Sequence, residues 1–143
     1  MSISSIKNDW AEQDPNLWWE YTCLAIKRVC KESNVDPKKI ISIGISYQMH
    51  GLVIVDSNGE PLRDSIIWCD SRAVDIGNKA YEKLGEEKCM SQLLNSPGNF
   101  TASKLKWVKE NEPDIYEKIY KYMLPGDYIA YKLTGEILSL IHI

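Results

Sequence analysis

The sequence lacks the features that mark several classes of protein. No apolar run approaches the roughly 20 residues that a membrane-crossing helix needs. The net charge is only −3 and the pI is about 5.4, so the basic excess of nucleic-acid-binding proteins is missing. Residues 1–9 are polar and Ser-rich, unlike a secretory signal peptide. We therefore expect a cytoplasmic chain with neither a nucleic-acid nor a membrane partner.

Metal-binding and disulfide signatures are missing as well. The four cysteines show no C-x-x-C spacing, and the two histidines, His50 and His142, are far from any cysteine pair. A zinc site is therefore not expected, and reduced thiols are favoured over a disulfide framework. The hydrophobic content of 44% is nevertheless enough for a core, and 143 residues fit one domain or part of a larger one.

What the sequence does contain is a strongly apolar stretch over residues 40–56. Two runs rich in β-branched residues, 40–45 and 52–55, predict strands, and their near-continuous apolar character predicts burial on both faces. Between them lies a polar insert, Gln48-Met49-His50-Gly51. Polar groups at a strand end are well placed for a ligand, and glycine lets the backbone approach it closely. From the residues alone, the alternative is a plain strand connection with an incidental histidine.

The flanking segments predict short strands and amphipathic helices. Asp14 followed by Pro15 is a helix-opening signal, and apolar residues at helical spacing extend this helix to residue 33. Residues 57–59 predict a hairpin turn, and residues 65–68 predict a third strand. Further helices are predicted from an Asp70 cap to about Leu84, and over residues 86–94, 101–112, 113–119 and 128–133. This order predicts a mixed β-sheet flanked by helices.

Five blocks of sequence, taken in order, match one family. They are Trp10-Ala11-Glu12-Gln13-Asp14-Pro15 with Trp18-Trp19, then Gly44-Ile45-Ser46-Tyr47-Gln48-Met49-His50-Gly51, Ile67-Trp68-Cys69-Asp70-Ser71-Arg72, Asn99-Phe100-Thr101-Ala102-Ser103-Lys104-Leu105-Lys106-Trp107, and Leu124-Pro125-Gly126-Asp127-Tyr128 with Leu133-Thr134-Gly135-Glu136. Over residues 10–137 the chain thus resembles the N-terminal domain of the FGGY carbohydrate kinases, and its Gln-Met-His-Gly block is similar to that of the xylulokinases within this family. Each block alone is a weak signal, whereas five in order are specific.

The resemblance implies a fold and a reaction. The fold is α/β, a ribonuclease-H-like (actin-like ATPase) domain, here incomplete, with substrate bound between two such domains. The reaction is ATP-dependent phosphorylation of a ketopentose, D-xylulose to D-xylulose 5-phosphate, with ATP and Mg²⁺ serving the full-length protein and neither expected on this chain alone. Such transfer relies on positioning and charge stabilisation, with a carboxylate taking the hydroxyl proton. Kinases for ribulose, fuculose and rhamnulose share this architecture, so the ketose stays open.

The resemblance also implies six sugar-binding residues, namely Gln48, Met49, His50, Trp68, Asp70 and Arg72. Histidine offers a donor and an acceptor to adjacent hydroxyls, and methionine an adaptable apolar wall. Gln48 is expected to hold the loop and Trp68 to wall the site. For Asp70 and Arg72, the alternative is a helix cap and a surface ion pair.

Two further positions have other expected roles. Asn99-Phe100 falls where the family has a substrate-side loop, with an ordinary ordered loop as the alternative. Asp127 is expected to cap a helix rather than to catalyse, because the turn chemistry alone accounts for it. No catalytic, metal-ligating or cofactor-binding residue is expected within this chain.

The family pattern is expected to extend beyond this chain. No Gly-rich, phosphate-facing segment precedes Trp10, and the general-base aspartate of the family is expected beyond residue 143. Residues 1–9 are expected to be a flexible start, 10–137 a partial N-terminal kinase domain, and 138–143 an atypical tail. The alternatives are a non-catalytic sugar-binding module, an incomplete domain with no ligand of its own, and a kinase for another ketose or polyol. The isolated fragment is expected to self-associate.

Overall fold

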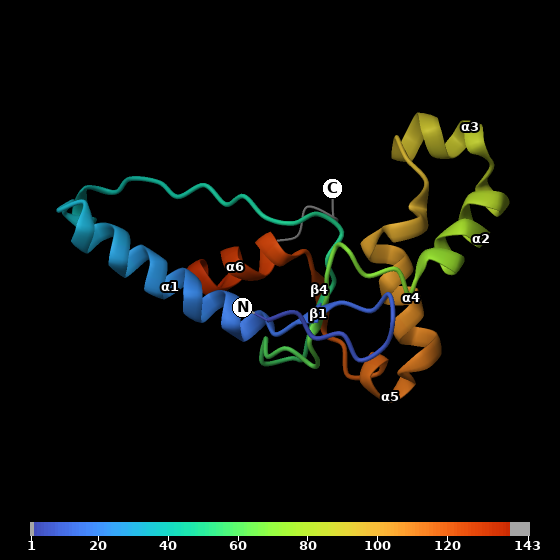
Figure 1. Cartoon of the computed structure of the whole chain (residues 1–143), viewed down its shortest axis with the longest axis horizontal. Helices are drawn as coiled ribbons and strands as arrows, with labels where there is room; N and C mark the ends of the chain where they lie inside the picture. Colours follow the sequence, from blue (N-terminus) through green and yellow to red (C-terminus); the bar gives the residue numbers. More distant parts are fainter. Residues whose placement is uncertain (1, 138–143) are drawn as a thin grey trace.

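A computed structural model describes residues 2–137, which form an elongated molecule with helices at both ends and short strands between them (Figure 1). In chain order the elements are β1 (Glu12–Gln13), α1 (Pro15–Glu32), the 3₁₀ turn η1 (Pro37–Lys39), β2 (Val53–Val55), β3 (Ser65–Ile66), α2 (Val74–Leu84), α3 (Glu86–Lys88), the π-helical turn η2 (Cys89–Leu93), the 3₁₀ turn η3 (Pro97–Asn99), α4 (Thr101–Asn111), α5 (Pro113–Tyr116), β4 (Lys121–Met123) and α6 (Pro125–Thr134). None of the helices in this range has the length and hydropathy that crossing a membrane requires.

Strand β2 is the centre of the molecule because it is buried on both faces. Val53 and Val55 pack into a cluster with side chains of α1 and α6, and Leu52 and Ile54 pack into a second cluster with side chains of α4 and α5. Side chains alternate across a strand, so one apolar run supplies two cores. Each such side chain contributes about 1.5–3 kcal/mol when it leaves water. The prediction of a doubly buried strand is confirmed for residues 52–55.

The strand pairs around β2 are short and antiparallel. β1 pairs with β3, which sets Glu12 opposite Ile66, and β2 pairs with β4. A single bridge from Leu52 to Ile66 joins the two pairs. Ser4, in the start that we expected to be flexible, exchanges two main-chain hydrogen bonds of 2.9 Å with Glu12. β1 and β4 were not predicted, because two or three residues of mixed polarity carry no clear period-2 signal.

Local signals fix several helix ends as predicted. α1 begins at Pro15, directly after Asp14, whose carboxylate accepts a hydrogen bond from the backbone N–H of Asn16 at 2.8 Å. α2 stops at Gly85 and α6 at Gly135, and the two glycines have φ angles of +87° and +77°. Glycine adopts positive φ angles without the steric cost that a side chain brings.

The start of α2 differs from the prediction. We expected Asp70 to cap this helix, but the helix begins at Val74. The Asp70 carboxylate instead accepts the backbone N–H of Arg72 at 3.0 Å, in the turn before the helix. Aspartate caps turns and helices with the same chemistry, so the sequence alone does not separate the two.

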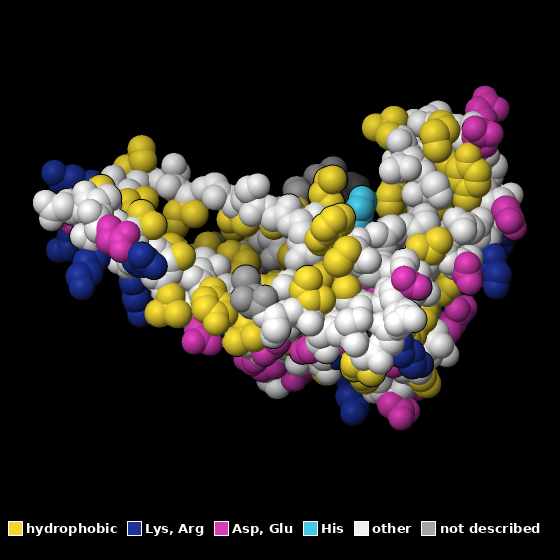
Figure 2. Space-filling view, in the orientation of Figure 1, with side chains coloured by type: hydrophobic (Ala, Val, Ile, Leu, Met, Phe, Trp, Pro, Cys, Tyr) yellow, Lys and Arg dark blue, Asp and Glu magenta, His cyan; other side chains and the backbone are white. Residues whose placement is uncertain are grey.

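Residues 40–45, predicted as a strand, form none. They run as an extended segment beside α6, with no strand partner in the part of the chain that the structure describes (Figure 1). Ile41 is 97% exposed and Ile43 61%. A groove of about 470 Å³ lies between this segment and Leu133 of α6, and Figure 2 shows hydrophobic side chains gathered along it. β-branched residues favour a strand only where a neighbouring strand is present for that strand to pair with.

We expect the chain to self-associate through this extended segment, because exposed branched side chains on unpaired backbone promote strand association. Replacing Ile41 and Ile43 together by lysine should shift the chain toward monomer, as measured by size-exclusion chromatography with light scattering. Leu94→Lys is the matched control, since Leu94 is 83% exposed outside this segment and its replacement should leave association unchanged. A wild-type chain that elutes as a monodisperse monomer would contradict the prediction.

Candidate functional site

A pocket of about 340 Å³ lies where three segments of the chain meet. It is lined by Gln48, Met49, His50, Trp68 and Asn99. These residues come from the turn before β2, the loop after β3 and the 3₁₀ turn η3. The fold thus brings together four of the six residues predicted to bind sugar, and it adds Asn99, for which the sequence left an ordinary loop as the alternative.

The main chain of Trp68 is held from both sides of this pocket. Its N–H donates to Gln48 Oε1 at 3.0 Å, and its carbonyl accepts from Asn99 Nδ2. With these bonds in place, Trp68 remains 59% exposed. An exposed indole fixed through its backbone presents a rigid apolar face, and its ring N–H remains a polar contact for a ligand.

His50 occupies a strained backbone position at the pocket. Its φ angle is +61°, in the left-handed region, where a residue with a side chain loses about 1–2 kcal/mol. Its ring stacks on Phe100, with centroids 4.8 Å apart and ring planes 14° apart. Burial, and secondarily the ammonium of Lys104, lower the pKa of His50. At neutral pH the ring is therefore mainly neutral and offers one donor and one acceptor.

Helix α6 supports the same turn from another side. A side chain at Gly51 would place its Cβ 2.5 Å from Pro125 Cγ, and one at Gly126 would overlap the ring of Tyr47. Glycine at both positions lets the start of α6 press against residues 47–51. Asp127 helps to cap this helix, but from inside it, because α6 begins three residues earlier than predicted. Its Oδ2 accepts the backbone N–H of Leu124, the N-cap residue, at 3.0 Å.

Asn99 carries an unsatisfied acceptor. Its Oδ1 is buried and has no hydrogen-bond partner among residues 2–137, whereas buried polar atoms are nearly always paired. Its Nδ2 is engaged by the Trp68 carbonyl, and this bond orients the amide. Because Asn99 lines the pocket, this oxygen is an acceptor there that lacks a donor from the described residues.

Asp70 and Arg72 form the predicted pair, but neither lines the pocket. Asp70 is fully buried and accepts the backbone N–H of Ala11 at 2.6 Å. Arg72 Nη2 lies 2.7 Å from Asp70 Oδ2. The pair is therefore a buried link to the start of the chain, which is neither the surface ion pair nor the helix cap considered as alternatives.

The guanidinium of Arg72 also lies against two aromatic rings. Its central carbon is 3.8 Å from the Trp10 ring centroid and 4.9 Å from that of Trp107, and Nη1 lies 2.6 Å from Glu12 Oε1. Glu12 is bonded in turn to Arg63. This cluster connects β1, the loop before α2 and helix α4, and that loop carries Trp68 of the pocket.

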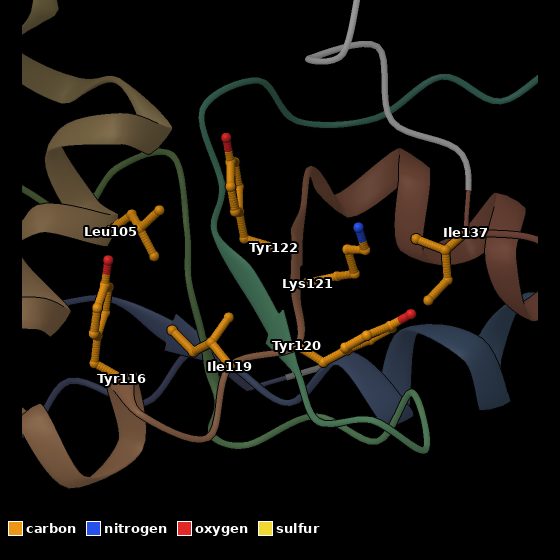
Figure 3. A pocket seen from close by; sticks show the side chains of 7 residues that line it. All are labelled: Leu105, Tyr116, Ile119, Tyr120, Lys121, Tyr122 and Ile137. Atoms are coloured by element: carbon orange, nitrogen blue, oxygen red, sulfur yellow. The ribbon is translucent and has the colours of Figure 1, made fainter.

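A second cavity, of about 330 Å³, lies along β4 and is shown in Figure 3. Its lining residues are Leu105, Tyr116, Ile119, Tyr120, Lys121, Tyr122 and Ile137. It contains none of the residues predicted to bind sugar, and Lys121 is its one charged lining side chain. The pocket at Gln48–His50 is therefore the better candidate site, because its polar groups come from several segments and include an unpaired acceptor.

Comparison with known proteins decides the family. The model of the FGGY family of carbohydrate kinases, N-terminal domain, matches residues 1–140. The chain belongs to this family. It is 38% identical over 132 residues to the xylulose kinase of Staphylococcus xylosus, covering 92% of this chain and 27% of that protein. It is 36% identical over 130 residues to the xylulose kinase of Escherichia coli (strain K12), covering 91% of this chain and 26% of that protein.

Solved structures of family members share the fold. A crystal structure described as a xyloylose kinase from Brucella ovis matches with a TM-score of 0.85 and 35% identity, over 95% of this chain and 28% of that one. A ligand-bound xylulose kinase from Lactobacillus acidophilus matches with a TM-score of 0.81 and 26% identity, over 95% of this chain and 27% of that one. The α/β, actin-like fold class is thus confirmed. This FGGY chain spans about a quarter of the length of the curated relatives it matches.

Removing the carboxylate of Asp70 should destabilise the domain, because the Arg72 charge would stay buried without its partner. We expect Asp70→Ala to lower the free energy of unfolding by about 3–5 kcal/mol, as measured by urea denaturation followed by circular dichroism. The control is Glu32→Ala, which breaks the exposed Arg28–Glu32 pair and should cost about 0.5 kcal/mol or less. Equal losses in the two variants would contradict the structural role of Asp70.

Proposed function

We propose that the pocket lined by Gln48, Met49, His50, Trp68 and Asn99 holds the ketose of an ATP-dependent sugar kinase. We further propose that the whole protein phosphorylates D-xylulose at its 5-hydroxyl. The observation that carries the proposal is the convergence of a neutral histidine, an unpaired amide oxygen and an exposed indole in one pocket, in a chain of the FGGY family. Sugars require this combination of polar edges and an apolar face.

Each side chain has a distinct proposed role. His50 donates to one sugar hydroxyl and accepts from a neighbouring one, and Asn99 Oδ1 accepts from a third. Trp68 packs on the C–H face of the sugar. Met49, which is 70% exposed, supplies an adaptable apolar wall. Gln48 acts indirectly, because its Oε1 already accepts the Trp68 N–H. This bond ties the turn before β2 to the loop after β3.

The proposed reaction needs groups that we place outside residues 2–137. The sugar hydroxyl attacks the γ-phosphorus of ATP, the bond to the β–γ bridging oxygen breaks, ADP leaves, and the hydroxyl proton passes to a carboxylate. Among the described residues, no three His, Cys, Asp or Glu side chains are grouped so that they could hold a metal ion. We place the Mg²⁺ and nucleotide sites in the rest of the whole protein and assign to this chain the binding and orientation of the sugar.

A non-catalytic sugar-binding module is the second candidate. One observation favours it, because no carboxylate is among the residues that line the pocket. Asp70 is close in sequence to Trp68, but its oxygens are engaged by Arg72 and by the backbone of Ala11. The two candidates share the sugar site and differ in whether the whole protein transfers phosphate.

Loss of the His50 ring should weaken ketose binding. In the ¹⁵N-labelled chain titrated with D-xylulose, we expect shifts of the Trp68 indole N–H and of the Asn99 side-chain amide. His50→Ala should raise the dissociation constant about ten- to a hundredfold, the equivalent of about 1–3 kcal/mol for one lost hydrogen bond that leaves a partner unpaired. D-ribulose, titrated in parallel, reports on the preferred ketose.

Exposed Arg28 on α1 provides the matched control for this titration, since Arg28→Ala removes a side chain outside the pocket. Its D-xylulose affinity should equal that of the wild type. If His50→Ala also left affinity unchanged, the ring would be a packing residue and the proposed sugar contact would be rejected.

The chain alone should not turn over substrate, because its candidate pocket lacks a carboxylate to accept the hydroxyl proton. A coupled assay with MgATP and D-xylulose should give a rate equal to that of the buffer. The His50→Ala variant, purified in the same way, controls for contaminating kinases. Turnover that follows the wild-type chain through purification and disappears in the variant would contradict this prediction.

A further inference from the structure

Lys104 occupies an unusual position for a cation. It is the fourth residue of α4, and it is completely buried. The positive end of the helix dipole disfavours a cation in the first turn, and removal of an ammonium from water costs several kcal/mol in addition. A methionine would fill the same space at a smaller cost, so filling the core does not account for the charge.

The hydrogen bonds of Lys104 show what the charge contacts. Its Nζ donates to the carbonyl oxygen of His50 at 2.8 Å and to that of Asn99 at 3.3 Å. These carbonyls belong to two different walls of the pocket. Thr101, one turn earlier, donates to the carbonyl of Gly51 at 3.3 Å, so the start of α4 is anchored to the same turn. Among the described side chains, Lys104 alone donates to the carbonyls of both His50 and Asn99.

We propose that Lys104 is a positioning residue for ketose binding, which fixes the spacing between the His50 wall and the Asn99 wall and holds His50 in its left-handed backbone conformation. The inference rests on the proposed function of the pocket and adds a residue that does not line it. Strained backbone persists only where its surroundings determine it. Among residues 2–137, the bond from the Lys104 ammonium to the His50 carbonyl is the one charge-assisted hydrogen bond to the backbone of this turn.

The surrounding charges are compatible with a protonated amine at neutral pH. Burial lowers the pKa of Lys104 to about 8, whereas the Asp70 carboxylate acts to raise it and the Arg72 guanidinium to lower it. His50 is neutral, as its own pKa is lowered by burial and by this ammonium. Lys104 therefore donates as a cation at pH 7 and loses its charge as the pH rises through about 8.

Three variants of the full chain test the proposal by titration with D-xylulose at pH 7. Lys104→Met keeps the length of the side chain and removes both hydrogen bonds, so we expect D-xylulose affinity to fall about tenfold or more. Lys104→Arg keeps the charge and the donors and should recover part of this loss. Lys106→Met is the matched control, because Lys106 is exposed on the same helix and forms an ion pair with Glu110. This variant should bind D-xylulose as the wild type does.

A second measurement needs no substitution and covers the case in which Lys104→Met does not fold. In the wild-type chain, the carbonyl ¹³C shifts of His50 and Asn99 should titrate together with a midpoint near pH 8, and D-xylulose affinity should decline over the same range. A merely structural lysine would leave the affinity constant while the shifts titrate.

The outcomes separate the two hypotheses. Wild-type binding with a weakened Lys104→Met and an unchanged Lys106→Met supports the proposal. Equal affinity of wild type and Lys104→Met, or an affinity that stays constant through the carbonyl titration, overturns it while leaving the proposed function intact. No shift of any pocket resonance with any ketose in the wild type overturns the proposed function, and the role of Lys104 in ketose binding with it.

Discussion

The burial of the Arg72 guanidinium is the constraint on which much of this structure depends. Its strand pairs have only two or three residues per strand, so main-chain ladders alone hold little together. Arg72 lies against the rings of Trp10 and Trp107, donates hydrogen bonds to Asp70 and forms an ion pair with Glu12. A desolvated cation–π contact is worth about 2 kcal/mol, and the ion pairs add directional bonds whose loss leaves a buried charge. Segments far apart in sequence are thereby fixed in one arrangement.

The sequence predicts the elements that need no distant partner. Asp14 and Pro15 specify the start of α1, Gly85 and Gly135 specify two helix ends, and the apolar run at 52–55 specifies a doubly buried strand. All of these features depend on residues a few positions apart. The run at 40–45 has the same composition and forms no strand, because a strand depends on its pairing as much as on its own residues.

The candidate site was predictable only in part, for a similar reason. Gln48, Met49, His50 and Trp68 stand out by family resemblance, and the fold brings them together. The bonds that connect the walls run between segments far apart in the chain, and neither composition nor spacing records them. The sequence signal at Lys104 is weaker. It is a cation in the first turn of a helix, where the helix dipole disfavours it. Asp70 and Arg72 are the opposite case. The family motif identified them as a pair, but the sequence did not predict that this pair is buried.

The left-handed backbone at His50 also restricts how the specificity of this site can diverge. Glycine, asparagine and aspartate tolerate that conformation, whereas β-branched and bulky residues do so rarely. Met49, the preceding residue, has no such restriction and is largely exposed. A library that seeks a new sugar preference therefore has a wide range of residues at position 49 and a narrow one at position 50. Among relatives that keep this turn, differences in the sugar bound should therefore accompany substitutions at position 49, while position 50 varies little.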